Sequence, residues 1–147
     1  MKINQISLFV ENKPGAMSAP CKVLADEGIS ISTLSLADTK FFGVLRLLVY
    51  DWKRAKDVLE KSGFAVKLTD VVAIEVDHTA GSLAKILTIL DENKINVEYM
   101  YAFASGFRGK AALIFRFEDA DAAMEKLSGN EGIRIVDAET LLGDSHE

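Results

Sequence analysis

Two short loops in this sequence place a glycine directly ahead of a predicted helix. Residues 11–17 read Glu-Asn-Lys-Pro-Gly-Ala-Met, and residues 77–83 read Asp-His-Thr-Ala-Gly-Ser-Leu. A glycine at a strand-to-helix junction lets a ligand approach the backbone, because no side chain stands in the way. The unpaired amides of the first helical turn lie at the positive end of the helix dipole and favour a carboxylate. Both loops therefore predict a turn that binds an anion.

Polar groups in the same loops supply acceptors for a positively charged group. The side-chain oxygen of Asn12, the carboxylate of Asp77 and free loop carbonyls all suit an α-amino group. Donors for a carboxylate beside acceptors for an amine predict a site for a free amino acid or a similar small zwitterion. The expected ligand-binding residues are Asn12, Pro14, Gly15, Ala16, Met17, Asp77, His78, Gly81, Ser82, Leu83, Tyr99 and Tyr101.

Several of these residues also have a purely structural interpretation. Gly15 and Gly81 suit a tight turn with no ligand. Asn12 and His78 occupy matching positions in the two loops and also suit turn residues whose side chains bond to nearby backbone. The repetition of the loop, with polar residues beside each glycine, favours the ligand-binding interpretation.

The run Glu98-Tyr99-Met100-Tyr101-Ala102-Phe103 has an unusual aromatic content. On a strand its tyrosines share one face with Phe103, and Met100 takes the other face. Two interpretations stay open: packing within a sheet or interface, which suits the bulk and the hydroxyl of tyrosine, or a tyrosine wall beside the ligand.

Catalytic and metal-binding patterns are missing from the sequence. It contains no Ser-His-Asp arrangement, P-loop or Gly-x-Gly-x-x-Gly motif. His78 has no cysteine pair or nearby histidine to complete a metal site, and Cys21 lies on the apolar stripe of a predicted helix, which favours a core position. We therefore expect no catalytic residues, no metal and no cofactor.

Composition excludes several partners. The 147 residues are 49% hydrophobic and 27% charged, with a formal net charge of −5. This negative charge, without a Lys/Arg cluster, disfavours nucleic acid, and no apolar run approaches the roughly 20 residues that span a bilayer. The single cysteine and the absence of a signal-peptide pattern predict a cytoplasmic protein.

The chain repeats itself with a shift of 66 positions, which carries Gly15 onto Gly81. The same shift superposes two helical stripes with i, i+3, i+4, i+7 spacing and matches Gly28, a plausible helix stop, with Lys94. Later the shift is 68 and aligns Asp51 with Asp119. The stripes are Met17, Pro20, Cys21 and Leu24 in the first copy, and Leu83, Ile86, Leu87 and Leu90 in the second.

Each copy is predicted to run strand, helix, strand, strand, helix, strand, with an aspartate capping its second helix. This order is the ferredoxin-like arrangement, so we expect an α+β fold with two βαββαβ units packed side by side, an antiparallel sheet and helices on one face. The boundaries are residues 1–68 and 69–141, with a tail at 142–147. Predicted strands include 5–10, 44–50, 64–68, 111–117 and 133–136.

The loop-and-helix pattern, followed by Gly28-Ile29-Ser30-Ile31 or Lys94-Ile95-Asn96-Val97, resembles the signature of the ACT-domain family of regulatory amino-acid-binding modules. The resemblance covers nearly the whole chain and implies two units paired into one eight-stranded sheet. It also implies ligands near the unit interface against these loops. Two residues depart from the family pattern: Ala80 stands where proline is usual, and Pro20 lies inside a helix. The two sites are therefore not expected to be equivalent.

Three functions compete at this stage. The leading hypothesis is an amino-acid-binding regulatory protein without catalytic activity, acting on a target metabolic enzyme. The alternative is a ligand-independent regulatory or interaction subunit of an amino-acid biosynthetic enzyme. An unrecognised enzyme on the same scaffold comes third, since fold does not fix function. Exposed sheet edges and the aromatic strand predict a homodimer.

Overall fold

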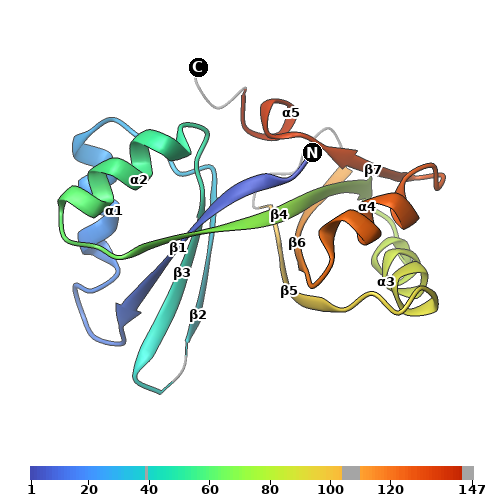
Figure 1. Ribbon diagram of the computed structural model, residues 1–147, viewed down its shortest axis with the longest axis horizontal. Helices are drawn as coiled ribbons and strands as arrows, with labels where there is room; N and C mark the ends of the chain where they lie inside the picture. The colour runs from blue at the N-terminus through green and yellow to red at the C-terminus, as the bar shows by residue number, and fades with distance from the viewer. Residues whose placement is uncertain (39, 104–109, 144–147) are drawn as a thin grey trace. The chain divides into compact units, whose positions relative to one another are not determined.

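The computed structural model describes residues 1–38, 40–103 and 110–143, which fall into two compact units (Figure 1). We call them the N-terminal unit, Asn4–Thr69 together with Leu142 and Gly143, and the C-terminal unit, Asp70–Leu141 together with Met1–Ile3. The first contains β1 (Ile3–Glu11), α1 (Ser18–Asp26), β2 (Thr33–Asp38), β3 (Phe42–Leu48), α2 (Trp52–Lys61) and the start of β4 (Val66–Asp77). The second contains the rest of β4, then α3 (Ser82–Glu92), β5 (Val97–Ala102), β6 (Lys110–Phe117), α4 (Ala120–Leu127), β7 (Ile133–Val136) and α5 (Ala138–Leu142).

Both units have the predicted order of elements. In the N-terminal unit β1 lies between β3 and β4, and β2 is at the edge. In the C-terminal unit β4 lies between β6 and β7, and β5 is at the edge. Strand β3 is antiparallel to β1 and β2, and β6 is antiparallel to β4 and β5. The predicted α+β fold of two ferredoxin-like units is thus confirmed.

One strand serves both units. The sequence predicted separate strands on either side of the junction, and the resemblance implied eight strands, but β4 runs without a break from Val66 to Asp77. The described residues therefore form seven strands. The reason is local: neither Thr69 nor Asp70 at the junction is a glycine or proline that would interrupt a strand.

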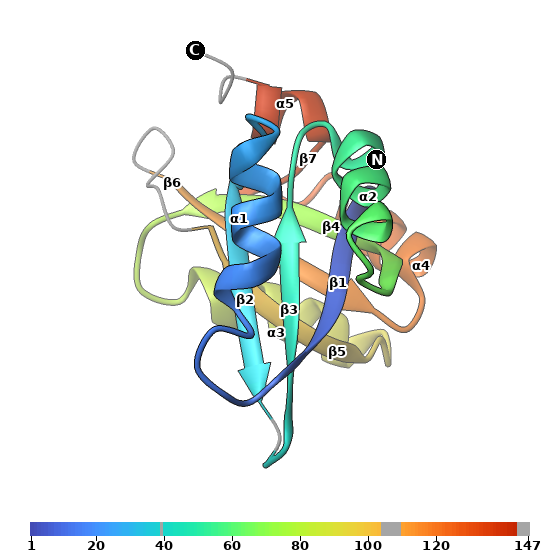
Figure 2. The same cartoon turned by 90° about the vertical axis from the view of Figure 1, so that its left-hand side faces the viewer.

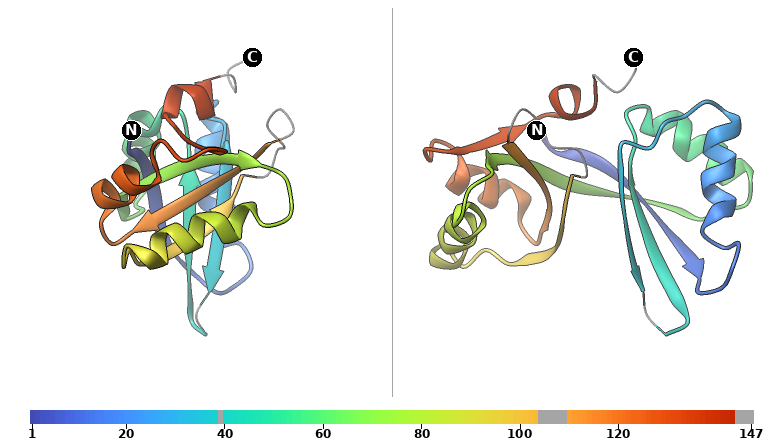
Figure 3. Two further views of the ribbon diagram at one scale, coloured as in Figure 1. Left: turned by 90° about the vertical axis from the view of Figure 1, so that its right-hand side faces the viewer. Right: turned by 180° about the vertical axis from the view of Figure 1, so that it is seen from behind.

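Each sheet buries one face under its own pair of helices. Figure 2 shows α1 and α2 lying together on one face of the β1–β3–β2 sheet, where Leu24 and Leu59 pack against Ile6 and Leu8. Figure 3 shows the equivalent pair, α3 and α4, against β4 and β6. Burial of alternate strand residues under two helices supplies the hydrophobic stabilisation that a unit of this size needs.

Strand β5 departs from regular alternation. Its pairing with β6 shifts between Val97 and Tyr99, so an extra residue is accommodated there as a β-bulge. As a result Val97 and Met100 both pack against the core of the C-terminal unit. Tyr99 and Tyr101 are half-buried. Phe103, the third aromatic residue of this run, is also half-buried and follows the strand.

The first helix of each unit ends in the same way. Gly28 follows α1 with φ of 68°, and Lys94 follows α3 with φ of 56°. In each case the next amide donates to a carbonyl at the helix end: Ile29 to Leu24 at 2.9 Å and Ile95 to Leu90 at 2.9 Å. This is the left-handed helix stop, and it confirms the predicted match between Gly28 and Lys94.

A short helix at the end of the described chain was not predicted. Asp137 precedes α5 and accepts a hydrogen bond from the Thr140 amide at 2.7 Å. Hydrogen bonds from the Thr140 side chain and amide hold the pKa of the Asp137 carboxyl below its ordinary value of 3.8. Leu142, placed in the tail by the sequence, ends α5 and is buried at 2% exposure. The rest of the predicted tail, 144–147, lies outside the described residues.

Candidate functional site

The loop between β4 and α3 is the more open of the two glycine loops. The backbone turns through Gly81 with φ of 89°, and α3 starts at Ser82. The Thr79 amide donates to the Asp77 carbonyl at 2.9 Å, and the Ser82 amide donates to the Thr79 carbonyl at 3.3 Å. No side chain caps the start of α3. The Ser82 amide is thus already engaged, and the Leu83 and Ala84 amides of the first turn are left to solvent or a ligand.

A hollow of about 370 Å³ opens beside this loop, and we call it the C-terminal hollow. Its lining comes from three places: the end of β4 and its loop, the first turns of α3, and the turn before β7. The lining residues are Val76, Asp77, Thr79, Ala80, Gly81, Ser82, Lys85, Glu131, Gly132 and Ile133.

Charged groups of both signs border the C-terminal hollow. The Asp77 carboxylate forms an ion pair with Lys110 at the start of β6. This hydrogen bond and the negative charge of Asp77 raise the pKa of Lys110 above 10.5. The Lys85 Nζ atom donates to the main-chain carbonyl of Glu131. The hollow thus offers a carboxylate and an ammonium group to a ligand.

The loop between β1 and α1 has a similar backbone. Gly15 has φ of 86°, and α1 starts at Ser18 without a side-chain cap. The Asn12 amide donates to the Phe41 carbonyl at 3.1 Å. Both strand-to-helix loops therefore combine a left-handed glycine with an uncapped helix start.

The hollow beside the first loop is smaller, at about 140 Å³, and we call it the N-terminal hollow. Two of its charged groups neutralise each other, because Lys13 Nζ lies 2.9 Å from Glu11 Oε2. Its lining residues are Val10, Glu11, Asn12, Lys13, Met17, Leu36, Asp38 and Gly43.

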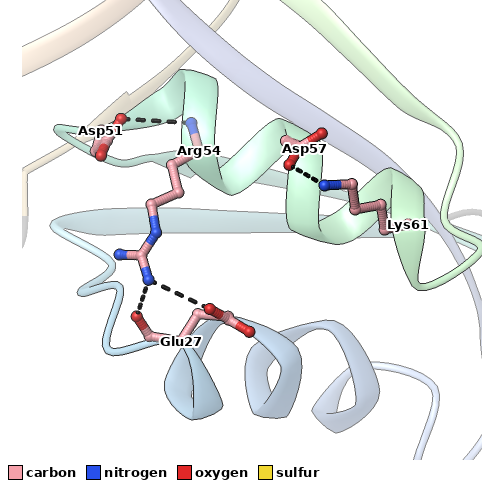
Figure 4. A network of polar contacts seen from close by, with 5 residues as sticks. All are labelled: Glu27, Asp51, Arg54, Asp57 and Lys61. Atoms are coloured by element: carbon pink, nitrogen blue, oxygen red, sulfur yellow. Dashed lines mark hydrogen bonds and ion pairs between the residues drawn. The ribbon is translucent and has the colours of Figure 1, made fainter.

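The second helix of each unit begins differently. The Asp51 carboxylate accepts from the Arg54 amide at 3.3 Å, and the Asp119 carboxylate accepts from the Ala122 amide at 3.0 Å. These are the predicted caps, and they are confirmed. Figure 4 shows Asp51 just before α2, with its carboxylate directed at the Arg54 amide. It also shows the Arg54 guanidinium reaching Glu27 after α1, and the Nη2 atom lies 2.7 Å from the Glu27 carbonyl oxygen and 3.2 Å from its carboxylate. Side-chain capping is thus used at α2 and α4 and not at α1 or α3.

Some of the predicted site residues line one of the two loop hollows, and the others do not. Five of them line a hollow: Asn12 and Met17 the N-terminal one, and Asp77, Gly81 and Ser82 the C-terminal one. The others belong to the lining of neither: Pro14, Gly15, Ala16 and His78 in the loops, Leu83 in the first turn of α3, and Tyr99 and Tyr101 on β5. Ligand contact by any of these residues stays a prediction.

Sequence reasoning missed several lining residues, of which Lys85, Glu131 and Gly132 matter most. Lys85 and Glu131 are 46 positions apart and meet only through the packing of α3 near the turn before β7. A lysine on the polar side of a helix carries no local signal that would mark it as a ligand contact. The glycines at 129 and 132 gave a weak signal, because they mark a turn whose backbone takes left-handed conformations.

A larger hollow of about 690 Å³ lies elsewhere in the C-terminal unit. Of its three lining cations, Lys2 and Arg116 already have partners: Lys2 Nζ lies 3.1 Å from Asp121, and Arg116 donates to the Asp70 carbonyl at 2.8 Å. Asp119, also in its lining, caps α4. Because Lys2, Arg116 and Asp119 are already engaged and neither glycine loop borders this hollow, we take the two loop hollows as the candidate sites.

The described residues contain neither a metal-binding cluster nor a membrane-spanning helix. No group of three or more His, Cys, Asp or Glu side chains in the described part of the chain is placed to hold a metal ion. No helix among these residues is long and apolar enough to cross a bilayer.

A family model and a solved structure each match nearly the whole chain. A model of the family described as ACT domain pair matches residues 1–142. Protein BT0572 from Bacteroides thetaiotaomicron, known from a crystal structure, is 36% identical, with 96% of each chain covered and a TM-score of 0.88. No protein of curated function matches the sequence.

Two solved structures share the fold at lower identity. The regulatory subunit of aspartate kinase from Thermus thermophilus is 20% identical over 84% of this chain and 89% of its own, with a TM-score of 0.60. The corresponding subunit from Thermus flavus is 19% identical over 84% and 88%, with a TM-score of 0.58.

Proposed function

The chain belongs to the ACT domain pair family, and from that premise we propose that it is an amino-acid-sensing regulatory protein. It binds a free amino acid or a similar small zwitterion at a strand-to-helix loop. It catalyses no reaction itself and reports ligand binding to a metabolic enzyme. We place it in the cytoplasm, as a homodimer, with residues 1–68 and 69–141 as its two ACT units.

One observation carries this proposal. Both glycine loops open an uncapped helix beside a hollow, whereas the second helix of each unit is closed by an aspartate. A structural turn gains from a side-chain cap, which stabilises a helix by about 1 kcal/mol. The first helix of each repeat has no such cap. This suits a site where a ligand carboxylate takes the place of the cap.

The chemistry of the loops suits a zwitterion. A ligand carboxylate can accept from the Leu83 and Ala84 amides in the first turn of α3. The first turn of α1 offers fewer donors, because the Ala19 amide donates to the Gly15 carbonyl at 3.2 Å and Pro20 has no amide hydrogen. The α-ammonium group needs acceptors, which are the carboxylate of Asp77, a lining residue of one hollow, and the side-chain oxygen of Asn12, a lining residue of the other. The side chain of the amino acid then determines which amino acid fits.

The link to a metabolic enzyme draws on the shared fold. The regulatory subunits of aspartate kinase from two Thermus species have this fold and act, as their names state, with an enzyme. To regulate a target in the same manner, this protein must hold its ligand more tightly in one conformation or assembly than in another. A ligand with equal affinity for both would shift nothing.

A screen of the twenty amino acids by thermal unfolding and calorimetry tests the proposal. A ligand at 100 times its Kd stabilises the folded state by about 2.7 kcal/mol, which raises the Tm of a chain of this length by roughly 5 to 10 °C. We expect such a rise with one or a few amino acids at millimolar concentration. A flat response to all twenty would refute the sensor.

A ligand-independent interaction subunit is the second candidate. It is favoured by apolar side chains on the face of the N-terminal sheet away from α1 and α2: Phe9 is 70% exposed and Phe42 is 55% exposed. Contiguous apolar surface of this kind often marks an interaction site. Capture of a target enzyme with the same yield in the presence and absence of every amino acid would favour this candidate.

A further inference from the structure

We propose that the zwitterion is bound in one of the two hollows only, the C-terminal one, by an opposite-charge pair, Asp77 and Lys85, that flanks Gly132. This inference rests on the proposed amino-acid-binding function and specifies its site. Lys85 joins the amides at the start of α3 in holding the ligand carboxylate, and Asp77 holds the α-ammonium group. The ligand is therefore one chemical class, a free α-amino acid with both groups unmodified.

Among the described residues, no carboxylate forms an ion pair with Lys85. This lysine lies on α3 one turn after the helix start, and its Nζ atom donates to the Glu131 carbonyl, a neutral partner. An ammonium group has three donors, so two stay available to a ligand carboxylate after the bond to Glu131. That bond also fixes the direction in which the Nζ atom points.

Asp77 is held in place from its other side. Lys110 pairs with the Oδ1 atom of Asp77, and the Oδ2 atom is the one that approaches Gly132. A carboxylate has about four acceptor positions, so pairing with Lys110 leaves Oδ2 able to accept from an ammonium group. Lys110 is therefore a positioning residue that orients Asp77 toward the hollow.

The charged atoms of Asp77 and Lys85 both lie close to Gly132. A Cβ atom added there would lie 3.9 Å from Asp77 Oδ2 and 4.0 Å from Lys85 Nζ. The absence of a side chain therefore leaves space that borders both charged atoms. The amino and carboxylate groups of an α-amino acid are separated by a single carbon, so both can approach these atoms from that space. A larger residue at 132 would fill it.

The described residues of the N-terminal unit lack this arrangement. The shift of 66 that relates the two loops places Ala19 at the position of Lys85 and Glu11 at the position of Asp77. The cation that does line the N-terminal hollow, Lys13, is paired with Glu11 at 2.9 Å. The hollow itself is about 140 Å³, against about 370 Å³ in the C-terminal unit. Duplication thus preserved the loop but left the charge pair in one copy.

Calorimetric titration of the full chain tests the assignment with three probes: the amino acid that gives the largest rise in Tm, its carboxamide and its N-acetyl derivative. We expect one site per chain. Lys85→Met should weaken the free amino acid by roughly 10- to 100-fold, the range for a charge-assisted hydrogen bond. It should leave the already weak carboxamide unchanged. Asp77→Asn should weaken the amino acid similarly and leave the N-acetyl derivative unchanged.

Matched controls come from an exposed ion pair outside both hollows, Lys61 and Asp57 on α2, whose atoms lie 2.9 Å apart (Figure 4). Lys61→Met and Asp57→Asn change the same charges and should bind like the wild type. Two equal sites per chain would overturn the inference, as would wild-type affinity in Lys85→Met. Either outcome would leave amino-acid sensing intact, whereas no binding of any amino acid by the wild type would refute the proposed function itself.

Gly132→Ala adds an independent test with its own control. Gly132 and Gly129 have φ of 80° and 81°, so alanine strains the backbone equally at both. A Cβ at Gly129 meets nothing within 4 Å, whereas at Gly132 it meets both charged atoms. Both variants should lose similar stability, and only Gly132→Ala should lose affinity, by at least about tenfold. Equal affinities in the two variants would contradict the role of Gly132.

Discussion

A residue in the left-handed conformation follows the first helix of each unit. Substitutions at these two matched positions should change the stability of the protein in opposite directions. Lys94 and Gly28 end α3 and α1 with φ of 56° and 68°. Lys94 is the one residue other than glycine with a positive φ in the described part of the chain. We expect Lys94→Gly to stabilise the protein and Gly28→Ala to destabilise it, because only glycine adopts this conformation without strain.

The magnitude follows from two opposing contributions. The left-handed conformation of a residue with a Cβ atom costs roughly 1 to 2 kcal/mol of folded-state stability. Glycine loses roughly 0.4 to 1 kcal/mol more conformational entropy than alanine on folding. The net gain for Lys94→Gly is therefore about 1 kcal/mol. The net loss for Gly28→Ala is of similar size, because no atom lies within 4 Å of the added Cβ and no steric cost is added.

Urea unfolding followed by circular dichroism measures both changes, and calorimetry gives the matching Tm. A change of 1 kcal/mol corresponds to roughly 2 to 4 °C in a chain of this length. Lys94→Gly should raise the midpoint and Gly28→Ala should lower it, without a change in the denaturant dependence of the free energy of unfolding.

Lys94→Ala separates backbone strain from any effect of the lysine side chain. Alanine keeps the Cβ atom that disfavours a positive φ, so this variant should unfold close to the wild type. If Lys94→Ala stabilises as much as Lys94→Gly, the gain comes from the loss of the side chain. In that case the reasoning from φ is refuted. A loss of stability in Lys94→Gly would refute it directly.

Two further stability predictions follow from capping. Asp51→Ala and Asp119→Ala each remove a side-chain cap from a second helix, and each should cost about 1 kcal/mol in urea unfolding; the losses should add in the double variant, because the caps lie in different units. The pKa of Asp137 is lowered in the folded state. The carboxylate therefore contributes to the free energy of unfolding above pH 3.8, and this contribution is lost as the pH falls through the folded-state pKa. Asp137→Asn should therefore be less stable than the wild type at pH 7, and the two should converge in acid; a constant difference at both pH values would contradict this.

Local patterns predicted most of the fold correctly. The bounds of β7, Ile133–Val136, are those expected from the sequence, and Asp51 and Asp119 cap the helices assigned to them. Errors arose where a boundary depended on its surroundings. The junction residues Thr69 and Asp70 continue a strand that the sequence had divided, because no local breaker ends it.

The sequence predicted only part of the candidate site. The sequence located both loops, since glycine placement and amide donors are local properties. It did not locate Lys85 and Gly132, because their proximity to Asp77 depends on how α3 and the turn before β7 pack against the end of β4. No spacing rule links residues that are brought together in this way.

What the sequence alone determined was the doubled βαββαβ pattern, the apolar faces of its helices and strands, and the two glycine turns. All of these depend on residue type and on spacings within one repeat, which the physics of helices and strands translates directly into structure. The tertiary structure alone decided that β4 is continuous and that the two hollows differ in size. It also placed the Asp77 and Lys85 side chains beside Gly132, because side-chain proximity between distant segments is set by the packing of complete elements and not by their order.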